Sequence, residues 1–514
     1  MTQDRGPTAD TPSGRRWGLS WALGPLAGAL VALALIFHIR GWGSIPGGSC
    51  GSKYQACADG TDTLLFLAFG LTFGGGITLI GVLAMLVKRG FGRAQLIALP
   101  LAGAVLIAWP GWQIAQWLRG PMLDIAWTTA VDRPQEARVQ GLWVTDDGTV
   151  VRGLEDALVA HDPRGGERRW SVDAPVRMSL CSMSDTVSQG IALAAYARHE
   201  KPCESVAAID TDSGRTLWNR TVDANDLRFT RPQGGRVAID GGTAVVATKD
   251  GARAFGLRDG KPRWKYRADD ADCGPALVSG AGGRTRIVEV CDPWDAAKVT
   301  TRVVTLDSGS GKELHRRDLP TETDLSELDV ISTEPFVIRV AESDERGLDA
   351  VLAFGKDGGE PVVVKRIGTD VELALGTSQS RFPAQSGLKA LVHENTLIAA
   401  TQTSGGDVPQ HVSAYSLRDG ARQWRVKVAD TWEDEVGSLA VADGRIGVHV
   451  DDGRVLSLDP RTGAKQHDHG AVIDETGLKI EMEAQLLAGP GDGWILVNPD
   501  SGEHPPLVGL TLKD

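Results

Sequence analysis

A glycine-centred motif recurs seven times along this 514-residue chain, and it restricts the fold more than any other feature. The copies read "VAHDPRGGERRW", "AAIDTDSGRTLW", "RAFGLRDGKPRW", "VTLDSGSGKELH", "LAFGKDGGEPVV", "SAYSLRDGARQW" and "LSLDPRTGAKQH". Their shared glycines are Gly166, Gly214, Gly260, Gly311, Gly359, Gly420 and Gly463. Consecutive glycines lie 48, 46, 51, 48, 61 and 43 residues apart. That period, with strand-like flanks and no helical pattern, predicts the four-stranded blades of an all-β propeller.

Each copy predicts a β-hairpin. An apolar strand such as "SVAAID" enters a turn that glycine closes, and a second strand follows. Glycine suits the last turn position because that position requires φ > 0, which other residues adopt only with strain. An aspartate at the start of the turn can accept hydrogen bonds from the backbone amides that follow it. The third copy, "GRVAIDGGTAVVATKDGARAFGLRDGKPRWKYRA", divides at Gly-Gly, Asp-Gly and Asp-Gly into four short strands.

A column of large side chains accompanies the glycines. Four residues after each glycine stand, in order, Trp170, Trp218, Trp264, His315, Val363, Trp424 and His467. We expect an aromatic ring at this position to pack between neighbouring blades and to bury up to roughly 200 Å².

The two ends of the repeat region predict ring closure. The stretch "IAWTTAV", residues 125–131, resembles the fourth strand of a blade, with Trp127 in the aromatic position. The C-terminal "AQLLAGPGDGWILVNPDSGEHPPLVGLTL" supplies three strands. We therefore expect the N-terminal strand to complete the last of eight blades, which removes an open sheet edge. Counting "NPDSG" as an eighth hairpin also gives eight blades, and seven result if the 61-residue interval holds irregular structure.

Three apolar runs precede the repeats, at about residues 19–39, 64–87 and 96–118. Each reaches the roughly 20 apolar residues that a bilayer span requires. The first is too long for a cleaved signal peptide, and no cleavage pattern follows it before Arg40. Gly24-x-x-x-Gly28 and Gly70-x-x-x-Gly74 would let these helices approach closely. The sequence thus predicts a tail (1–18), a three-helix membrane anchor (19–121) and a propeller (122–514).

Basic residues around the spans predict their orientation, because cytoplasmic loops carry the excess of Lys and Arg. The first tail and the second loop hold six such residues, Arg5, Arg15, Arg16, Lys88, Arg89 and Arg93. The first loop and the end of the third span hold three, Arg40, Lys53 and Arg119. We expect a multi-pass protein of the cell membrane with its N-terminus in the cytoplasm and its propeller outside.

The cysteines agree with an outer location. The chain has six, in the local pairs Cys50 with Cys57, Cys181 with Cys203, and Cys273 with Cys291. All lie on the predicted outer side, where disulfides persist. None fits a C-x-x-C metal pattern, although six cysteines permit fifteen connectivities and free reactive thiols are the alternative.

Two motifs raise the question of metal binding. Asp210-x-Asp212-x-Gly214 could open a calcium loop, but calcium needs about six to eight oxygen ligands. Four other copies place Arg where Asp212 stands, so we interpret this stretch as a hairpin turn. The "HDH" at residues 467–469 could also hold a metal, but His467 occupies the aromatic column and is better explained by packing. We expect no metal site here. The net charge of −12 further argues against a nucleic-acid partner.

The combination Asp-x-x-x-Gly-x-x-x-Trp at this period resembles the repeat of the PQQ-like, quinoprotein-type propellers. The resemblance covers about residues 122–514. That family contains dehydrogenases that use pyrroloquinoline quinone (PQQ), and it also contains non-enzymatic members such as the outer-membrane assembly lipoprotein that scaffolds β-barrel insertion. A shared ring therefore implies the fold and leaves function to be argued from the site.

The resemblance implies two functions. We favour a non-catalytic binding or scaffold module for envelope proteins or polymers, without a cofactor, acting through the long loops Arg198–Glu204, Asp292–Lys298 (which includes Trp294) and Thr377–Gln385. The alternative is a PQQ- and Ca²⁺-dependent dehydrogenase that oxidises an alcohol or sugar at the outer membrane face. The near-minimal blades leave little chain to cover a cofactor, and we identify no catalytic residue. A transporter or sensor subunit would need polar residues in the spans or a cytoplasmic output domain, and the sequence offers neither.

Overall fold

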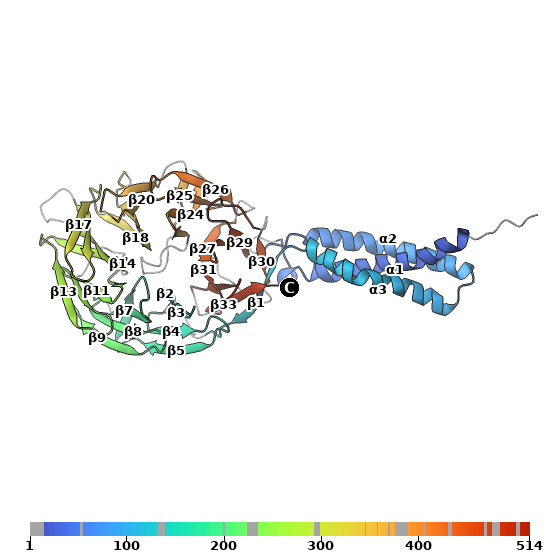
Figure 1. Cartoon of the computed structure of the whole chain (residues 1–514), viewed down its shortest axis with the longest axis horizontal. Coiled ribbons are helices and arrows are strands. Elements are labelled where there is room, and N and C mark those ends of the chain that lie inside the picture. The colour runs from blue at the N-terminus through green and yellow to red at the C-terminus, as the bar shows by residue number, and fades with distance from the viewer. Residues whose placement is uncertain are drawn as a thin grey trace, which may run out of the picture. The chain divides into compact units, whose positions relative to one another are not determined.

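A computed structural model gives the structure of residues 15–51, 55–131, 139–198, 201–223, 235–291, 299–344, 346–356, 358–367, 371–375, 389–403, 408–429, 434–466, 470–474, 484–499 and 504–513. The chain divides into two compact units, Met1–Met122 and Leu123–Asp514. The first is helical and the second is built from strands (Figure 1).

The first unit is a bundle of three long helices. They are α1 (Arg15–Trp42), α2 (Thr61–Lys88) and α3 (Arg93–Leu118), with a short 3₁₀ turn η1 (Pro46–Gly48) after α1. All three are long and apolar enough to cross a membrane. Large apolar side chains such as Phe66, Phe73 and Trp117 are exposed on the bundle. A bundle with apolar residues outward suits a lipid environment, so the helices suggest membrane anchoring.

Glycines allow α1 and α3 to touch at the backbone. A Cβ atom added to Gly28 would lie 1.9 Å from the carbonyl oxygen of Pro100, and one added to Gly103 would lie 1.8 Å from that of Pro25. Only glycine fits either position, as in other small-residue helix contacts. The second predicted motif behaves differently: Gly70 and Gly74 face no atom within 4 Å, so the prediction of a close contact there was wrong.

The three predicted disulfides are all formed. Cys50 and Cys57 close the loop between α1 and α2. Cys181 is joined to Cys203, 22 residues later in the chain. Cys273 is joined to Cys291, which lies directly opposite it on the neighbouring strand. Among the described residues no cysteine is free. Each bond limits the freedom of the unfolded chain and so stabilises the fold.

The strands of the second unit form sheets that follow one another around a ring (Figure 1). The first three sheets have four antiparallel strands each. The first contains β2 (Gly141–Val144), β3 (Val150–Gly153), β4 (Ala157–His161) and β5 (Arg168–Asp173). The second contains β6 (Met178–Met183), β7 (Ile191–Arg198), β8 (Ser205–Asp210) and β9 (Thr216–Thr221). The third contains β10 (Val237–Asp240), β11 (Thr243–Thr248), β12 (Gly251–Gly256) and β13 (Pro262–Arg267).

The next three sheets continue the ring. The fourth contains β14 (Cys273–Ala281), β15 (Arg284–Cys291), β16 (Thr300–Asp307) and β17 (Glu313–Asp318). The fifth contains β18 (Leu325–Thr333), β19 (Phe336–Glu342), β20 (Asp349–Phe354) and β21 (Val362–Arg366). The sixth contains β22 (Val371–Leu373), β23 (Ala390–His393), β24 (Thr396–Thr403), β25 (His411–Ser416) and β26 (Arg422–Lys427).

Ring closure joins the two ends of the second unit. One eight-stranded sheet contains, in spatial order, β27 (Val436–Ala442), β28 (Arg445–Val450), β29 (Arg454–Leu458), β30 (Ala471–Ile473), β1 (Met122–Thr128), β33 (Leu507–Leu512), β32 (Trp494–Val497) and β31 (Gln485–Ala488). The N-terminal strand β1 pairs antiparallel with the C-terminal strand β33, from Leu123 opposite Leu512 to Thr128 opposite Val508. The stretch "NPDSG" lies between β32 and β33, which pair antiparallel, and residues 500–502 of it lie outside the described residues.

Burial follows the position of a strand within its sheet. Every residue of β11 is buried, because neighbouring sheets cover both of its faces. The rim strand β5 instead alternates between exposed and half-buried residues. The apolar strands therefore form the cores between sheets, and the polar rim strands face water.

The tryptophans fasten each sheet to the next. Each indole Nε1 donates a hydrogen bond to a backbone carbonyl in the turn of the following sheet. These bonds run from Trp170 to Thr211 (2.9 Å), Trp218 to Leu257 (2.8 Å), Trp264 to Ser308 (2.8 Å) and Trp424 to Pro460 (3.0 Å). The repeated aromatic residue thus supplies both apolar contact and one directional bond at four junctions of the described ring.

The turn glycines are required by the same contact. Gly214 has φ +72°, and a Cβ atom there would lie 2.7 Å from the ring of Trp170 in the preceding sheet. The same arrangement recurs where Gly166 meets Trp127, Gly260 meets Trp218, Gly311 meets Trp264 and Gly463 meets Trp424. Gly420 also has positive φ but lies against the carbonyl oxygens of Val363 and Val364, because the fifth copy has no aromatic residue to offer.

The fifth copy corrects the sequence alignment. Gly358, with φ +68°, is its left-handed turn residue, and a Cβ atom there would lie 2.2 Å from the ring of His315. Gly359, which the alignment assigned, has open space around it. This turn is one residue shorter: its bond runs from the Gly358 amide to Gly355, whereas in the second copy the Gly214 amide reaches back four residues to Asp210. Two adjacent glycines make that shift invisible in the sequence.

Removing one of the docked indoles provides a test. We expect Trp218→Ala to lower the free energy of unfolding by about 3–5 kcal/mol, because it leaves a cavity at a sheet junction and deletes the bond to Leu257. Denaturant unfolding of the full-length protein in detergent, followed by circular dichroism, measures this change. Val176→Ala, at a site where the side chain is 89% exposed, should change it by less than about 0.5 kcal/mol. Equal losses for the two variants would contradict the docking role.

Candidate functional site

The aspartates at the turns serve the turns themselves. The Oδ1 atom of Asp210 accepts hydrogen bonds from the Ser213 amide (2.9 Å) and the Ser213 hydroxyl (2.6 Å), and the hydroxyl bond is the main reason that the pKa of Asp210 is lowered. Asp307 and Asp459 make the same pair of bonds in their own turns. Nothing in this bonding resembles a half-built calcium loop. In the described ranges no group of three or more His, Cys, Asp or Glu side chains is placed to hold a metal.

The three loops that the sequence suggested as contact surfaces lie wholly or partly outside the described residues. Residues 199–200 of Arg198–Glu204, all of Asp292–Lys298 and all of Thr377–Gln385 lie outside the described residues, as does the "HDH" at 467–469. The predicted repeat tryptophans and all the predicted repeat glycines except Gly359 lie at contacts between strands or sheets.

A crevice opens at the junction between the β14–β17 sheet and the β18–β21 sheet. It is a small space that is partly open to solvent. One wall comes from β15, β16 and β17 and the other from the turn between β20 and β21. Its lining residues are Arg284, Arg286, Val303, Thr305, His315, Arg317, Phe354, Gly355, Lys356, Gly358 and Gly359. We call this space the basic crevice, because four of these lining residues are arginine or lysine and none is a carboxylate.

Strand register explains why the cations gather on one wall. Thr305 on β16 lies opposite Arg286 on β15 and opposite His315 on β17, so the three side chains share one face of the sheet. Arg317 stands two residues after His315, so it points to the same face. Neighbouring apolar positions such as Val303 complete the wall.

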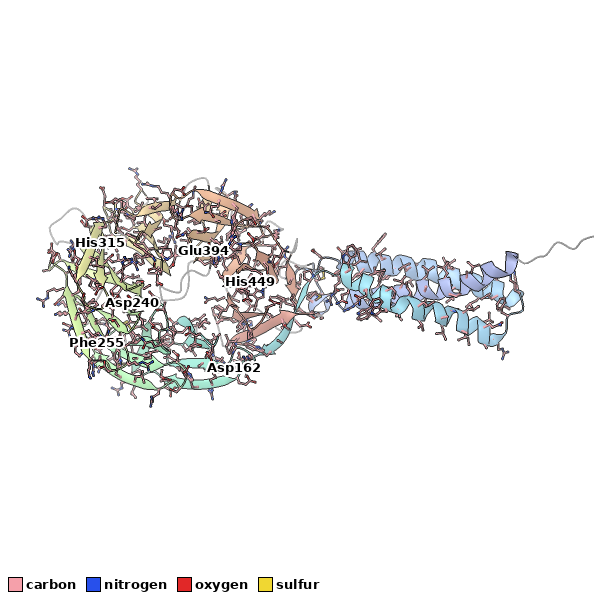
Figure 2. The ribbon with its side chains drawn as sticks, viewed as in Figure 1. Asp162, Asp240, Phe255, His315, Glu394 and His449 are labelled. Carbon is pink, nitrogen blue, oxygen red and sulfur yellow. A yellow bond between two sulfur atoms is a disulfide. The ribbon has the colours of Figure 1, made fainter. Side chains whose placement is uncertain are left out.

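One change in the aromatic column leaves the crevice open. His315 occupies the place that Trp170, Trp218 and Trp264 occupy at the three preceding junctions, and Figure 2 marks its position in the ring. Those three indoles are bonded to carbonyls in the next turn. Imidazole is smaller than indole, so it covers less of the turn beneath it. The space that remains is the crevice.

Arg286 is the best-fixed cation of the wall. Its side chain is 4% exposed, its Nη1 donates to the Thr333 carbonyl (3.3 Å), and its guanidinium lies over the ring of Phe336. Burial lowers the pKa of Arg286, partly offset by Glu334, whose carboxylate oxygen lies 3.8 Å from Nη2. Asp240, marked in Figure 2, also favours the charged form. The guanidinium is therefore held in one orientation by contacts on several sides.

The other cations are held more loosely. Lys356 lies 3.2 Å from Glu334, and Arg317 lies 4.0 Å from Glu360, whose side chain is 86% exposed. Exposed ion pairs of this kind contribute little and are screened by salt. Within the described part of the chain, Arg284 makes no ion pair. Of the four cations that line the crevice, only Arg286 is held by several contacts.

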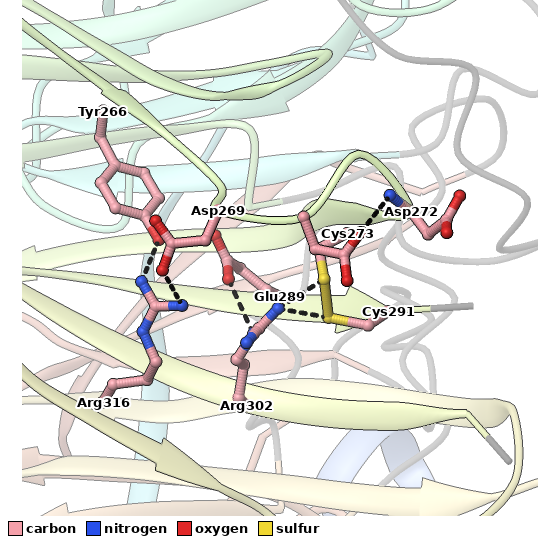
Figure 3. Close-up of a disulfide and its surroundings, with 9 residues drawn as sticks. Tyr266, Asp269, Asp272, Cys273, Glu289, Cys291, Arg302 and Arg316 are labelled. Carbon is pink, nitrogen blue, oxygen red and sulfur yellow. Dashed lines mark hydrogen bonds and ion pairs between the residues drawn. A yellow bond between two sulfur atoms is a disulfide. The ribbon is translucent and has the colours of Figure 1, made fainter. Parts of the chain in front are cut away.

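A buried charge cluster lies at the preceding junction, between β10–β13 and β14–β17 (Figure 3). Glu289 is fully buried, and burial raises the pKa of its carboxyl. Arg302 lies 3.1 Å from it and also contacts both sulfurs of the Cys273–Cys291 disulfide. Burial, with Glu289 nearby, raises the pKa of Tyr266, so its phenol stays protonated. Glu289 and Arg302 face each other on neighbouring strands of one sheet, and Tyr266 comes from the preceding sheet.

A second buried cluster lies beside β28 and β29. Arg454 donates to Asp452 (2.6 Å) and lies 3.6 Å from Asp434, and all three are almost fully buried. Burial raises the pKa of the neighbouring Asp451 to about 6 and lowers that of His449 to about 4. His449 is therefore neutral at pH 7. The cluster holds neighbouring strands together through the attraction between Arg454 and its two aspartates. Figure 2 shows His449 in a part of the ring away from His315.

Sequence reasoning did not find the basic crevice. The signal was present: the fourth copy is the first in which the aromatic column departs from tryptophan, and basic residues surround the departure in "RTRIV" and "LHRRD". The charges lie on different strands, so only the sheet register brings them together.

Comparisons with known proteins bear on the propeller. A family model described as outer membrane protein assembly factor BamB matches residues 124–271 and 202–359. Similar solved structures include quinohemoprotein alcohol dehydrogenase ADHIIG of Pseudomonas putida HK5 (12% identity, TM-score 0.45, covering 76% of each chain) and that of Comamonas testosteroni (11%, 0.44, 76% of each). BamB of Moraxella catarrhalis is 14% identical with a TM-score of 0.37, covering 74% of this chain and 96% of that one. A search of curated proteins found no match.

The matched segments contain the first four copies of the repeat and the start of the fifth, with the docked indoles of Trp170, Trp218 and Trp264. The ring of antiparallel sheets continues the same pattern beyond them. The strand-built unit of this chain is therefore a member of the PQQ-like β-propeller family.

Proposed function

We propose that this protein is a membrane-anchored, extracytoplasmic propeller that acts as a non-catalytic binding or scaffold module for envelope proteins or polymers. The family model that its propeller matches carries the description of an outer membrane assembly factor. The three apolar helices suit a membrane anchor. The propeller would then present its faces and loops to partners outside the membrane.

We further propose eight blades. Six sheets would each be one blade, and the eight-stranded sheet would be two, β27–β30 and β31–β33 completed by β1. The pairing of β1 with β33 favours this count, because it gives the last blade its fourth strand. A ring closed in this way has no free sheet edge on which aggregation could start.

One observation carries the non-catalytic role: several carboxylates of the described ring pair with cationic side chains and hold strands together, although Asp185 is not among them and burial raises its pKa to about 7. Glu289 is paired with Arg302, and Asp452 and Asp434 with Arg454. Within the β18–β21 sheet the half-buried Glu327 and Asp349 flank Arg339, and the half-buried Glu435 lies 3.3 Å from Lys389. A carboxylate that neutralises a buried arginine is not available as a catalytic base or calcium ligand without leaving that arginine unpaired, which is costly.

The outward orientation rests on two features. Three disulfides join the cysteines of the described chain in pairs, which suits an oxidising compartment. The excess of Lys and Arg before the first span and between the second and third spans favours a cytoplasmic location for those segments. An odd number of spans then places the propeller on the opposite side.

A cofactor titration tests the non-catalytic role. We expect the full-length protein in detergent to show no stoichiometric binding of PQQ with Ca²⁺ by isothermal titration, and no dye-linked oxidation of alcohols or sugars. A known PQQ dehydrogenase, reconstituted in the same detergent, is the positive control. Binding of one PQQ per chain with dye reduction would replace the scaffold role by the dehydrogenase alternative.

A labelling experiment tests the orientation. Val176→Cys places a thiol at a site 89% exposed on the propeller, and Lys88→Cys places one at the exposed end of α2. With the native cysteines in disulfides, a membrane-impermeant maleimide should label the first variant in intact cells or spheroplasts. The second should be labelled only after lysis. The reverse pattern would put the propeller in the cytoplasm.

A further inference from the structure

We infer that four cations on the rim of the ring bind a linear anionic polymer outside the membrane, one whose ionised groups are phosphates or carboxylates. The four are Arg220 on β9, Arg253 on β12, and Lys265 and Arg267 on β13. We call them the outer basic cluster. The inference rests on the proposed binding role and deepens it, because it names the chemistry of the partner.

The cluster lies where the second sheet meets the third. Trp218 on β9 and Phe255 on β12, which Figure 2 marks, approach across this junction with ring centroids 6.0 Å apart. Arg220 stands two residues after Trp218, and Arg253 stands two residues before Phe255. Because side chains alternate along a strand, both arginines are on the faces that meet. Arg220 also reaches across the junction, where its Nε donates to the carbonyl of Gly260 (3.2 Å).

Two of the cations are paired with each other across the sheet. Lys265 lies directly opposite Arg253, and Arg267 follows two residues later on the same face. Like charges directly opposite each other are destabilising. In the equivalent pairs of the first, second and fourth sheets at most one member is a cation. Those pairs are Val159–Ser171, Ala207–Asn219 and Val304–Arg316. The fold therefore does not require two cations at this position.

Carboxylates do little to neutralise the cluster. Within the described part of the chain Arg220, Arg253 and Lys265 make no ion pair, and the Nε of Arg253 is buried without a partner. Arg267 has one such contact, 3.5 Å from the exposed Asp250. Exposed pairs of this kind contribute little.

The other aspartates of these two hairpins lie in turns or beyond the strand ends. Asp270 and Asp272 belong to the connection that leads to β14, where they bond to each other. Two more pair with cations outside the cluster: Asp259 with Lys261 (3.5 Å) and Asp269 with Arg316 (2.8 Å). Asp223 follows β9. Counting Asp223 together with Asp250 still leaves a positive surplus, on a chain whose net charge is −12.

Protection of an open sheet edge does not explain this surplus. Lysine and arginine on an outermost strand discourage pairing with other chains, and Lys265 and Arg267 lie on such a strand. Arg253, however, lies on β12, which pairs with β11 on one side and β13 on the other. An acidic residue at position 265 would also protect the edge and would attract Arg253. An anionic partner accounts for both the sign of the charges and the place of Arg253.

The open surface favours a polymer over a small ion. Trp218 fills the junction beneath the cluster, and the side chains of Arg220, Lys265 and Arg267 are exposed. Positions two residues apart on a strand are about 7 Å apart, so one extended chain can contact successive cations. Each such contact releases counterions and adds to the affinity. Arginine in addition presents paired N–H groups that fit phosphate and carboxylate oxygens.

The place of the cluster in the ring favours a polymer over lipid headgroups. Figure 1 shows β9 and β13 across the ring from β1, the strand that follows the third helix in the chain. A polymer can reach that side in any orientation of the ring, whereas headgroups can reach it only in some.

The test uses the full-length protein in non-ionic detergent, with fluorescein-labelled poly-L-glutamate and linear polyphosphate as probes. We expect fluorescence anisotropy to show saturable binding of at least one polymer, with an affinity that falls as sodium chloride rises. The double variant Arg220→Gln/Lys265→Gln should weaken binding by about tenfold or more and reduce the salt slope by about 1.5. The matched control, Arg168→Gln/Arg461→Gln, removes two exposed arginines elsewhere and should bind as the wild type does. The polymer that binds more tightly identifies the ionised group.

A second variant separates a binding site from a neutral surface. Lys265→Glu replaces the like-charge pair with Arg253 by an attractive one. We expect its thermal unfolding temperature to stay at or above that of the wild type while polymer binding falls by about tenfold or more. The proposal fails if the wild type binds neither polymer saturably, or if binding survives in both cluster variants. That failure leaves the PQQ titration untouched, so the scaffold role and its partner chemistry are tested separately.

A quenching experiment distinguishes the polymer from the lipid surface. The protein with Lys265→Cys, labelled with bimane, is reconstituted into vesicles of phosphatidylcholine and phosphatidylglycerol that carry a headgroup spin label. We expect the same bimane fluorescence with and without the spin label. Strong quenching would place the cluster against the bilayer and contradict a polymer partner.

Discussion

The contact between an indole and the glycine turn of the next sheet holds this ring together. Each such contact joins two sheets through packing of the indole on a bare backbone and one hydrogen bond from Nε1 to a carbonyl. The glycine has to lack a side chain for two reasons, its positive φ and the approach of the indole. Because the contact repeats, a twisted four-stranded unit becomes a stack that curves into a circle.

A circle made of such stacks has one weak point, where its ends meet. Here the first strand of the unit pairs with the last, and Trp127 on that first strand docks on Gly166 just as the later tryptophans dock on theirs. Apolar clusters pack against both faces of strands β31–β33, and buried ion pairs such as Glu289 with Arg302 and Asp434 with Arg454 link neighbouring parts of single sheets. Such pairs add little net stability over apolar packing, but they leave a large penalty for any misaligned arrangement.

The same contact explains where binding chemistry can arise. A junction filled by indole has no room for a ligand, so a site between sheets needs a change in the repeat. That change occurs at His315. The residues around it include arginines and a lysine, although apolar side chains would have filled the space left by the missing indole. The crevice is therefore best understood as a specialised junction of an otherwise uniform ring.

The sequence by itself predicted the repeat, its hairpins, the aromatic column, a closing strand, the three apolar helices and the local cysteine pairs, because each leaves a recognisable pattern of residue types along the chain. The sequence alignment assigned the turn position of the fifth copy to Gly359, whereas Gly358 occupies it. Two adjacent glycines satisfy the same pattern, and only the turn geometry distinguishes them. The sequence also overestimated Gly70 and Gly74, because spacing does not tell which face of a helix meets a neighbour. Only the tertiary structure decided that Arg286, Thr305 and His315 form one wall opposite a glycine turn. The three residues come from three strands of one sheet, and the glycine turn belongs to the next sheet. The pairing register that aligns the three strands is a property of the assembled fold.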